Sequence, residues 1–156
     1  GRFLQCWNEN ALLPVVAYVV HGGATMTGYA VVLASEEFER VQAVSMISSV
    51  AASSDVPVEV FVTMNGLNAF ETETVENRDF TGGRVAEAMM AAENESPLFT
   101  EQLEKAKAIG PLKVYACEMA MDVLGNELED YVDVFDDTLG VSGFLNRAQD
   151  KQIIFV

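Results

Sequence analysis

Four short apolar runs along the chain predict the strands of one sheet. The first, residues 29–34 (YAVVLA), is apolar throughout, which is typical of a strand covered on both faces in a parallel sheet. The second, residues 58–63, is followed by the turn residues Asn65 and Gly66. The other two predicted strands span residues 112–116 and 152–156. We therefore expect a buried central sheet.

Segments with helical spacing separate these strands. Ser35 is predicted to cap the first helix, with Glu36 and Glu37 in its first turn, where the positive end of the helix dipole favours acidic side chains. One stripe would form the apolar side of this helix: Phe38, Val41, Val44, Ile47 and either Val50 or Ala51. Because strands and helices alternate, the chain is predicted to fold as a right-handed, helix-covered α/β sheet.

The remaining helices are bounded by turn and capping residues. They are predicted over residues 85–93, 97–109, 118–124 and 141–148. Ser96 and Pro97 would begin the second of these, Gly110 and Pro111 would end it, and Gly125 would end the third. The apolar side of helix 97–109 would consist of Leu98, Leu103, Ala106 and Ile109.

Two acidic segments interrupt this alternation. Residues 71–84 are predicted to form a surface loop of the kind that insertions produce. Residues 127–137 form the second acidic segment. Within it, Val132, Val134 and Phe135 form an apolar strip that we predict as a contact between subunits.

The first 25 residues differ from the rest of the chain. Their apolar stretch, residues 11–20, is too short to span a bilayer. A single early positive charge at Arg2, the acidic Glu9 and the lack of a small-x-small site all disfavour a signal peptide. A complete fold can be written from Tyr29 onward. We therefore predict that residues 1–25 are a non-native or flexible extension, that Met26 is the true start, and that residues 26–156 form one domain.

Composition sharpens this picture. The 156 residues include 9 Lys or Arg and 24 Asp or Glu, for a formal charge of -15, while 50% are hydrophobic. A chain of this length can fold without disulfides, and its apolar blocks exclude disorder. The acidic surface disfavours direct binding to nucleic acid or to anionic membranes. One interpretation of the acidic excess is a halophilic protein that stays soluble in high salt.

Few residues are available for catalysis. The chain has two cysteines, Cys6 and Cys117, and one histidine, His21, in unrelated contexts, so neither an intramolecular disulfide nor a metal site is expected. It also lacks a Gly-x-Ser-x-Gly elbow, a Gly-rich phosphate loop and a histidine placed to act as a base for Cys117. A hydrolase is therefore hard to build, and we predict no cofactor and no metal.

The candidate chemistry lies at the carboxyl ends of the predicted strands, where open parallel sheets bind their ligands. The loops at residues 35–37, 64–67 and 117–119 are expected to meet there. Cys117 would lie between a strand and a helix N-terminus, whose N–H groups and dipole stabilise a thiolate, whereas the adjacent Glu118 disfavours a second negative charge. Two interpretations of Cys117 stay open: a reactive nucleophile or a buried small hydrophobe.

Two neighbouring features also have alternative interpretations. The Asn65-Gly66 pair is either a tight turn or a backbone cradle for a persulfide or thiosulfonate anion. Met119 and Met121 lie two residues apart, so they face different ways on a helix. One of them is expected to pack inside the fold, and the other to line a thiol pocket or a subunit contact.

Three segments resemble the DsrE/DsrF-like proteins, and most closely their stand-alone branch, often labelled peroxiredoxin-like. Residues 113–125 (KVYACEMAMDVLG) are similar to the strand–Cys–helix segment of that branch, where Cys-x-Met-Ser-Met-Asp is typical. Residues 61–67 (FVTMNGL) are similar to the end of the family's second strand, and residues 140–145 (GVSGFL) to its last helix. The resemblance extends over residues 29–156. Ala120 departs from it, because the family usually has Ser or Thr there.

The resemblance implies a flavodoxin-like three-layer sandwich with a mainly parallel central sheet. It also implies that the protein forms homo- or hetero-oligomers, of which we expect a homo-oligomer such as a trimer or hexamer, and that Cys117 accepts and passes on persulfide sulfur. The expected partners are sulfur donor and acceptor proteins in the cytoplasm, with no direct contact to nucleic acid or membrane. The candidate pocket residues around Cys117 are Ser35, Met64, Asn65, Gly66, Glu118, Met119, Met121 and Asp122.

Three functions are compatible with these features. The first is a sulfurtransferase-like sulfur carrier that uses Cys117. The second is a non-catalytic oligomeric binding or scaffold protein of the same fold, in which Cys117 is buried and inert. The third is a small-molecule binder that uses the strand-end cleft, for which the sequence offers neither aromatic nor phosphate-loop support.

Overall fold

The computed structural model describes residues 20–21, 24–91 and 95–156, and its centre is a five-stranded parallel sheet. Across the sheet the strands lie in the order β6-β5-β4-β3-β7. Their bounds are β3 Tyr29–Leu33, β4 Val58–Val62, β5 Leu112–Cys117, β6 Asp137–Leu139 and β7 Gln152–Phe155. An antiparallel pair, β1 Val20–His21 and β2 Ala24–Thr25, precedes the sheet. The four predicted strands are thus confirmed.

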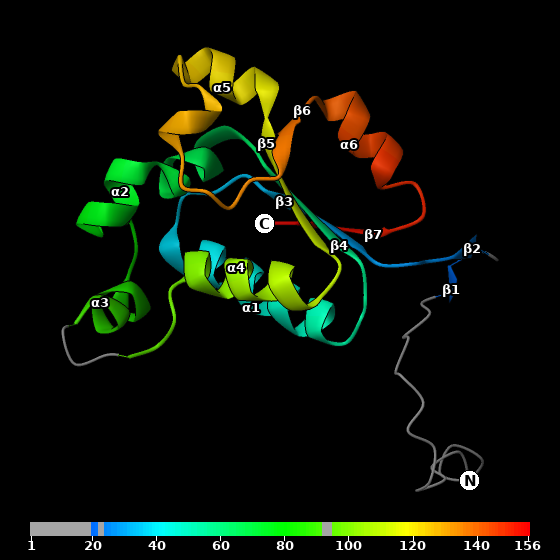
Figure 1. The fold of residues 1–156 in the computed structure, drawn as a ribbon, viewed down its shortest axis with the longest axis horizontal. Helices are drawn as coiled ribbons and strands as arrows, with labels where there is room; N and C mark the ends of the chain where they lie inside the picture. The colour runs from blue at the N-terminus through cyan, green and yellow to red at the C-terminus, as the bar shows by residue number, and fades with distance from the viewer. Residues whose placement is uncertain (1–19, 22–23, 92–94) are drawn as a thin grey trace, which may run out of the picture.

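Helices cover both faces of the sheet and give the fold its three layers (Figure 1). On one face α1 Phe38–Ser53 and α4 Phe99–Ile109 pack side by side. On the other side of the view lie α5 Glu118–Leu124 and α6 Val141–Arg147. The shorter elements are η1 Met64–Phe70, α2 Thr72–Asn77, α3 Arg84–Met90 and η2 Leu128–Asp130. This arrangement is the predicted α/β, flavodoxin-like fold.

The strand order reverses at one place in the sheet. From β3 to β6 each new strand is added on the same side, and β7 then returns to the far side of β3. The switch therefore lies between β3 and β7. Because ligand crevices form at such a point, the loop after β3 lies nearer to the expected crevice than the end of β5, two strands away.

The apolar runs form strands because the sheet is buried on both faces. All five residues of β4 are buried, and its register aligns Val60 with Val31 of β3 and Val114 of β5. These three valines share the face that packs on α1 and α4. The continuous apolar pattern thus indicates a strand that is buried on both faces, and not a strand with one face in solvent.

The opposite face is fixed to α6 by one stacked pair and one ion pair. Phe144 of α6 stacks on Phe61 of β4, with ring centroids 4.7 Å apart. Arg147 donates from Nη2 to Oε1 of Glu59 at 2.7 Å, and its guanidinium lies 5.0 Å from the centre of the Tyr115 ring. Glu59 can therefore be buried in the sheet because a cation on α6 neutralises it.

Several element boundaries differ from the prediction. The acidic segment 71–84 is not a continuous loop, because it contains α2 and the first residue of α3. Helix α4 begins at Phe99, with Leu98 in the cap position, so the predicted start at Ser96 and Pro97 was wrong. Ser35 lies before the helix cap at Glu37; its Oγ accepts a hydrogen bond from the Glu37 N–H at 3.1 Å.

The strand β6 was not predicted. It has three residues, begins at the last position of the acidic segment 127–137 and contains no apolar run. Asp136, just before it, docks on β5: its backbone N–H donates to the Val114 carbonyl at 2.7 Å, and its Oδ2 accepts from the Val114 N–H at 2.8 Å. The pairing of β6 with β5 thus begins with a side-chain carboxylate that takes the place of a backbone carbonyl. The hydrophobic pattern of a sequence does not reveal such a contact.

The apolar stripe of α1 was predicted correctly only in its first half. Phe38, Val41 and Val44 are buried, whereas Ile47 and Val50 are exposed. In the second half the buried positions include Ser45 and Ser48, on the side that faces α4. Small side chains let two helices approach closely, and the Ser45 Oγ donates to the Gln102 Oε1 at 2.7 Å. Ile109 of α4 is likewise exposed.

The apolar strip predicted as a subunit contact belongs to the core. Val134 and Phe135 are buried and Val132 is half-buried. Phe135 joins a cluster of phenylalanine rings with centroid distances of 5.1–6.3 Å: Phe38, Phe70, Phe80, Phe99 and Phe135. The strip therefore closes the protein's own core under the segment before β6.

The prediction for residues 1–25 falls mostly on positions outside the described residues, as does Cys6. From Thr27 onward the chain is tied to the domain, because the Thr27 Oγ1 donates to the Asp150 Oδ2 at 2.6 Å. No helix within the described part of the chain is long and apolar enough to span a membrane.

Candidate functional site

Cys117 is the last residue of β5 and the cap residue of α5. It pairs in register with Leu139 of β6, so it lies inside the sheet and not at its edge. Helix α5 then ends at Gly125, which adopts a left-handed conformation with φ 71°. The predicted strand–Cys–helix order is confirmed, and the thiol occupies a fixed point at the carboxyl end of the sheet.

The thiol itself is enclosed: Cys117 is 0% exposed. Ala120 and Met121, which follow in α5, are also buried, whereas Glu118, Met119 and Asp122 are exposed. The two methionines therefore face opposite ways, as predicted. Met121 packs inside the fold, and Met119 lies on the surface above the strand end.

Thr63 is a neighbour of Cys117 that sequence reasoning missed. Val62 of β4 pairs with Ala116 of β5. Thr63 directly follows Val62, and Cys117 directly follows Ala116. Both are buried. Thr63 thus brings a hydroxyl to the level of the thiol from the neighbouring strand, at a site where α5 has Ala120 and no hydroxyl. A register between strands is needed to see this, and no local motif shows it.

Glu118 connects the start of α5 with the segment around β6. Its Oε1 accepts a hydrogen bond from the Thr138 Oγ1 at 3.5 Å, and a Cβ placed on Gly140 would lie 3.5 Å from its Oε2. The carboxylate therefore extends toward β6 and α6. It thereby links the two segments that adjoin the buried Cys117: α5, which follows it in sequence, and β6, whose Leu139 pairs with it.

The chain turns tightly after β4, at the start of η1. Met64 adopts a left-handed conformation with φ 49°, and the Gly66 N–H donates to the Thr63 carbonyl at 3.0 Å. A Cβ on Gly66 would lie 2.5 Å from the Leu33 carbonyl oxygen, so only glycine allows this approach. Because the Gly66 N–H is used within the turn, the turn interpretation of Asn65 and Gly66 holds and the anion cradle loses a donor.

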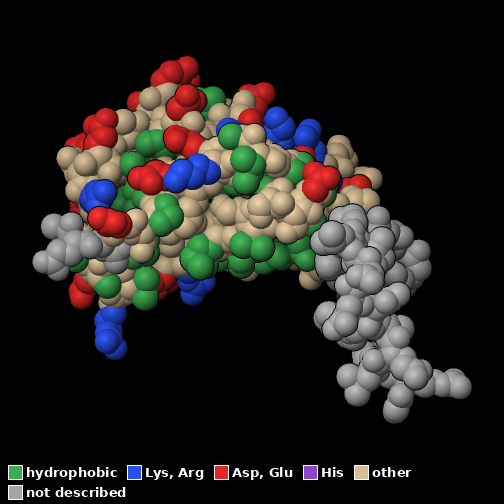
Figure 2. All heavy atoms as spheres, turned by 60° about the horizontal axis from the view of Figure 1, so that its bottom comes forward, with side chains coloured by type: hydrophobic (Ala, Val, Ile, Leu, Met, Phe, Trp, Pro, Cys, Tyr) green, Lys and Arg blue, Asp and Glu red, His purple; other side chains and the backbone are tan. Residues whose placement is uncertain are grey.

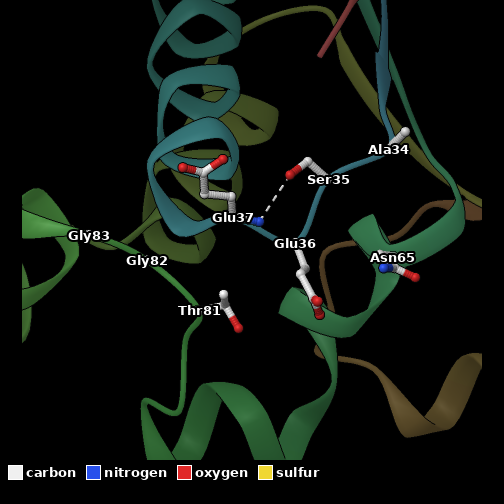
Figure 3. Close-up of a pocket in the computed structure, with 8 residues that line it drawn as sticks. All are labelled: Ala34, Ser35, Glu36, Glu37, Asn65, Thr81, Gly82 and Gly83. Atoms are coloured by element: carbon white, nitrogen blue, oxygen red, sulfur yellow. Dashed lines mark hydrogen bonds between the residues drawn. The ribbon is translucent and has the colours of Figure 1, made fainter.

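A surface pocket of about 530 Å³ opens beside the loop after β3 (Figure 3). Ser35 and Asn65 line it, so two of the predicted pocket residues are brought together there. Cys117 is not among its lining residues, which are Ala34, Ser35, Glu36, Glu37, Asn65, Thr81, Gly82 and Gly83. The pocket and the cysteine are therefore two separate features at the carboxyl end of the sheet.

Glu39 holds the outer wall of this pocket. Its Oε1 accepts hydrogen bonds from the backbone N–H groups of Gly83 at 2.7 Å and Ala86 at 3.1 Å. These bonds cap the start of α3. The Ala86 N–H holds the pKa of the Glu39 carboxyl below its usual value; burial opposes this shift, and further backbone N–H groups, including that of Gly83, reinforce it.

Lowering the pH is expected to break the two hydrogen bonds by which Glu39 holds this wall. Because the pKa of Glu39 is lowered in the folded state, its contribution to stability is complete above its usual value of about 4.5 and is lost as the pH falls through the lower folded value. Hydrogen exchange of the Gly83 and Ala86 amides, corrected for intrinsic rates, should then accelerate relative to α4 amides. In Glu39→Gln that pH dependence should vanish; an unchanged profile in this variant contradicts the assignment.

The remaining chemistry of the described residues is sparse. No group of three or more His, Cys, Asp or Glu side chains in this part of the chain is arranged to hold a metal ion. The pocket wall is acidic, with Glu36 and Glu37 on the segment before α1 (Figure 3). Such a wall repels phosphate groups. Cys117 is thus the one nucleophilic thiol that the described structure offers.

Comparison with known proteins gives a family and a fold. A model described as the DsrE/DsrF/DrsH-like family matches residues 74–156, a stretch that includes β5, Cys117 and α5. No curated protein matches the chain. A solved structure, that of the protein of unknown function MTH1491 from Methanobacterium thermoautotrophicum, is similar with a TM-score of 0.52 and 14% identity. The match covers 82% of this chain and 96% of that one, and it supports a shared fold.

Proposed function

The chain belongs to the DsrE/DsrF/DrsH-like family, and we propose that it is a sulfur-relay protein that carries sulfur as a persulfide on Cys117. The observation that carries the proposal is the position of Cys117. It is the residue at which β5 becomes α5, inside the part of the chain that the family model matches. Sulfur donor and acceptor proteins are the proposed partners.

The proposed step is a thiol–persulfide exchange. The Cys117 thiolate attacks the terminal sulfur of a donor persulfide, R–S–SH; a new S–S bond forms on Cys117, the donor S–S bond breaks, and the donor leaves as its thiolate. An acceptor thiolate then attacks the terminal sulfur on Cys117 in the same way. No net oxidation occurs, because one thiol and one persulfide are consumed and formed in each step.

This chemistry suits the few reactive groups that are present. The exchange needs neither a histidine base nor a metal, since the thiolate attacks sulfur and the leaving group is itself a thiolate. The acidic pocket beside α1 does not include Cys117 and is not required for the exchange.

The burial of Cys117 supports a second candidate. A thiol that is 0% exposed behaves as a small hydrophobe, as it would in a non-catalytic oligomeric scaffold of the same fold. For a sulfur carrier the same burial implies that α5 or the β6–α6 segment must move before a donor can reach the thiol. The two candidates thus differ in whether the closed state opens to a persulfide.

The test is intact-mass measurement after exposure to a persulfide. The Cys6→Ser variant, in which Cys117 is the remaining thiol, is reduced and incubated with polysulfide, or with thiosulfate and a rhodanese, beside Cys6→Ser/Cys117→Ser. We expect Cys6→Ser to gain the mass of one sulfur atom that dithiothreitol removes, and the double variant to gain none.

The scaffold candidate predicts a different pattern. If Cys6→Ser gains no sulfur from either donor system while its unfolded chain does, the Cys117 thiol is intact but inert, and the carrier proposal is wrong. Circular dichroism of Cys6→Ser/Cys117→Ser checks that loss of the adduct reflects loss of the thiol and not loss of the fold.

A further inference from the structure

Helix α1 has a long uncharged stretch on an otherwise acidic protein. Residues 41–54 contain no Asp, Glu, Lys or Arg, although 21% of the chain is charged. The neighbouring helix α4 shows the usual pattern, with Glu101, Glu104 and Lys105 exposed. A solvated helix face in this chain would be expected to carry charges. Their absence from α1 indicates a face that is covered by protein.

The exposed side of this stretch is apolar. Met46 is 54% exposed, Ile47 50% and Val50 67%. Because residues three and four apart lie on the same side of a helix, these three side chains are neighbours on the side of α1 that does not contact α4. In Figure 2 hydrophobic side chains gather along the lower edge of the face that carries α1 and α4, and most acidic side chains in view lie above them.

The same residues form one wall of a groove of about 600 Å³. Tyr29 of β3 and Ile154 of β7 contribute to the groove from the sheet, and none of the described residues that line it is charged. The groove lies between α1 and β7, which is the edge strand next to β3. Within the described part of the chain, no helix lies over β7 beside α1 on this side of the sheet.

We infer that α1 of a second copy of this chain fills the groove. Each α1 would project Met46, Ile47 and Val50 into the groove of the other copy and cover its Ile154. One surface then supplies both the protrusion and the groove, which is the condition for a two-fold symmetric, isologous contact. This inference does not depend on Cys117 or on sulfur transfer.

The lack of charge in the groove narrows the choice of occupant. The charge of -15 on each copy opposes association, and a contact whose lining carries no carboxylate adds no further repulsion at close range. A basic partner would instead be recognised by acidic side chains, and the groove offers it none. An apolar surface of the same shape, brought by a second copy, is therefore the occupant that fits.

The first test is the molar mass in solution. Light scattering on the full chain is expected to give twice the 17.0 kDa of one chain at micromolar concentration. The double variant Ile47→Glu/Val50→Glu places two carboxylates in the contact and is expected to weaken association about 100-fold or more. Val123→Glu changes an equally apolar residue, 80% exposed on α5, and should leave the mass unchanged.

The second test locates the contact directly. In a Cys6→Ser/Cys117→Ser background, Val50→Cys is expected to give a covalent dimer with a mild oxidant, because Val50 lines the groove that the other copy's α1 fills and projects from α1 into that same contact. Val123→Cys should give no covalent dimer in non-reducing denaturing gel electrophoresis. Circular dichroism confirms that each variant is folded.

The possible outcomes separate cleanly. A monomer at all concentrations, or an oligomer whose mass the double variant does not change, overturns the inference. An assembly larger than a dimer supports it when the double variant halves its mass, since the two-fold contact is then the one removed. Failure of Val50→Cys to cross-link while Val123→Cys does so also overturns it.

Discussion

In the folded protein Cys117 is expected to react with iodoacetamide at least about 100-fold more slowly than in the urea-unfolded chain. The reason is that its sulfur is 0% exposed, so alkylation requires an opening of α5 or of the β6–α6 segment. An opening that costs about 3 kcal/mol or more lowers the reactive population by two or more factors of ten.

The measurement uses Cys6→Ser, in which Cys117 is the remaining thiol, and follows the alkylated mass with time. Adding a persulfide donor protein tests whether binding promotes the opening: a sulfur carrier should then react faster, and an inert scaffold should not. Alkylation of the native protein at the rate of the unfolded chain would show that the thiol is already accessible. The opening step of the proposed mechanism would then be wrong.

Replacing Phe99 by alanine is expected to lower the free energy of unfolding by about 3–5 kcal/mol. Phe99 is fully buried at the start of α4 and lies 5.1 Å from the ring of Phe70, 5.5 Å from Phe80 and 6.3 Å from Phe38. The change removes the ring on which three others pack, and the cavity cannot close without moving α1 relative to α4.

Urea unfolding followed by circular dichroism gives the loss directly. Phe155→Ala is the matched control, because it makes the same chemical change at a side chain that is 74% exposed on β7, and it should alter stability by less than about 0.5 kcal/mol. A loss below about 1 kcal/mol for Phe99→Ala would contradict the central place of this ring in the core.

The segment around Cys117 could be predicted in detail because its signals are local. An apolar run makes β5, a cysteine ends it, and Gly125 stops α5 in a conformation that glycine adopts at little cost. The spacing of Met119 and Met121 likewise placed them on opposite sides of the helix. These properties depend on residues within a few positions of one another, so one sequence is enough to predict them.

Other features depend on contacts between distant segments and could not be predicted. Strand β6 exists because Asp136 docks on Val114, and Thr63 reaches the level of Cys117 only through the β4–β5 register. Ile47 and Val50 continue the helical stripe of α1, yet the tertiary structure buries Ser45 and Ser48 instead. Which side of a helix is buried is decided by the neighbour that packs on it.

The sequence by itself determined the alternation of strands and helices, the buried parallel sheet and the cysteine at a strand end, because backbone periodicity and turn residues act locally. The tertiary structure decided that Cys117 is enclosed, that the pocket beside α1 excludes it, and that α1 turns an apolar face outward. Exposure and proximity are properties of the packed chain, since they are set by residues far apart in sequence that burial of apolar surface brings together.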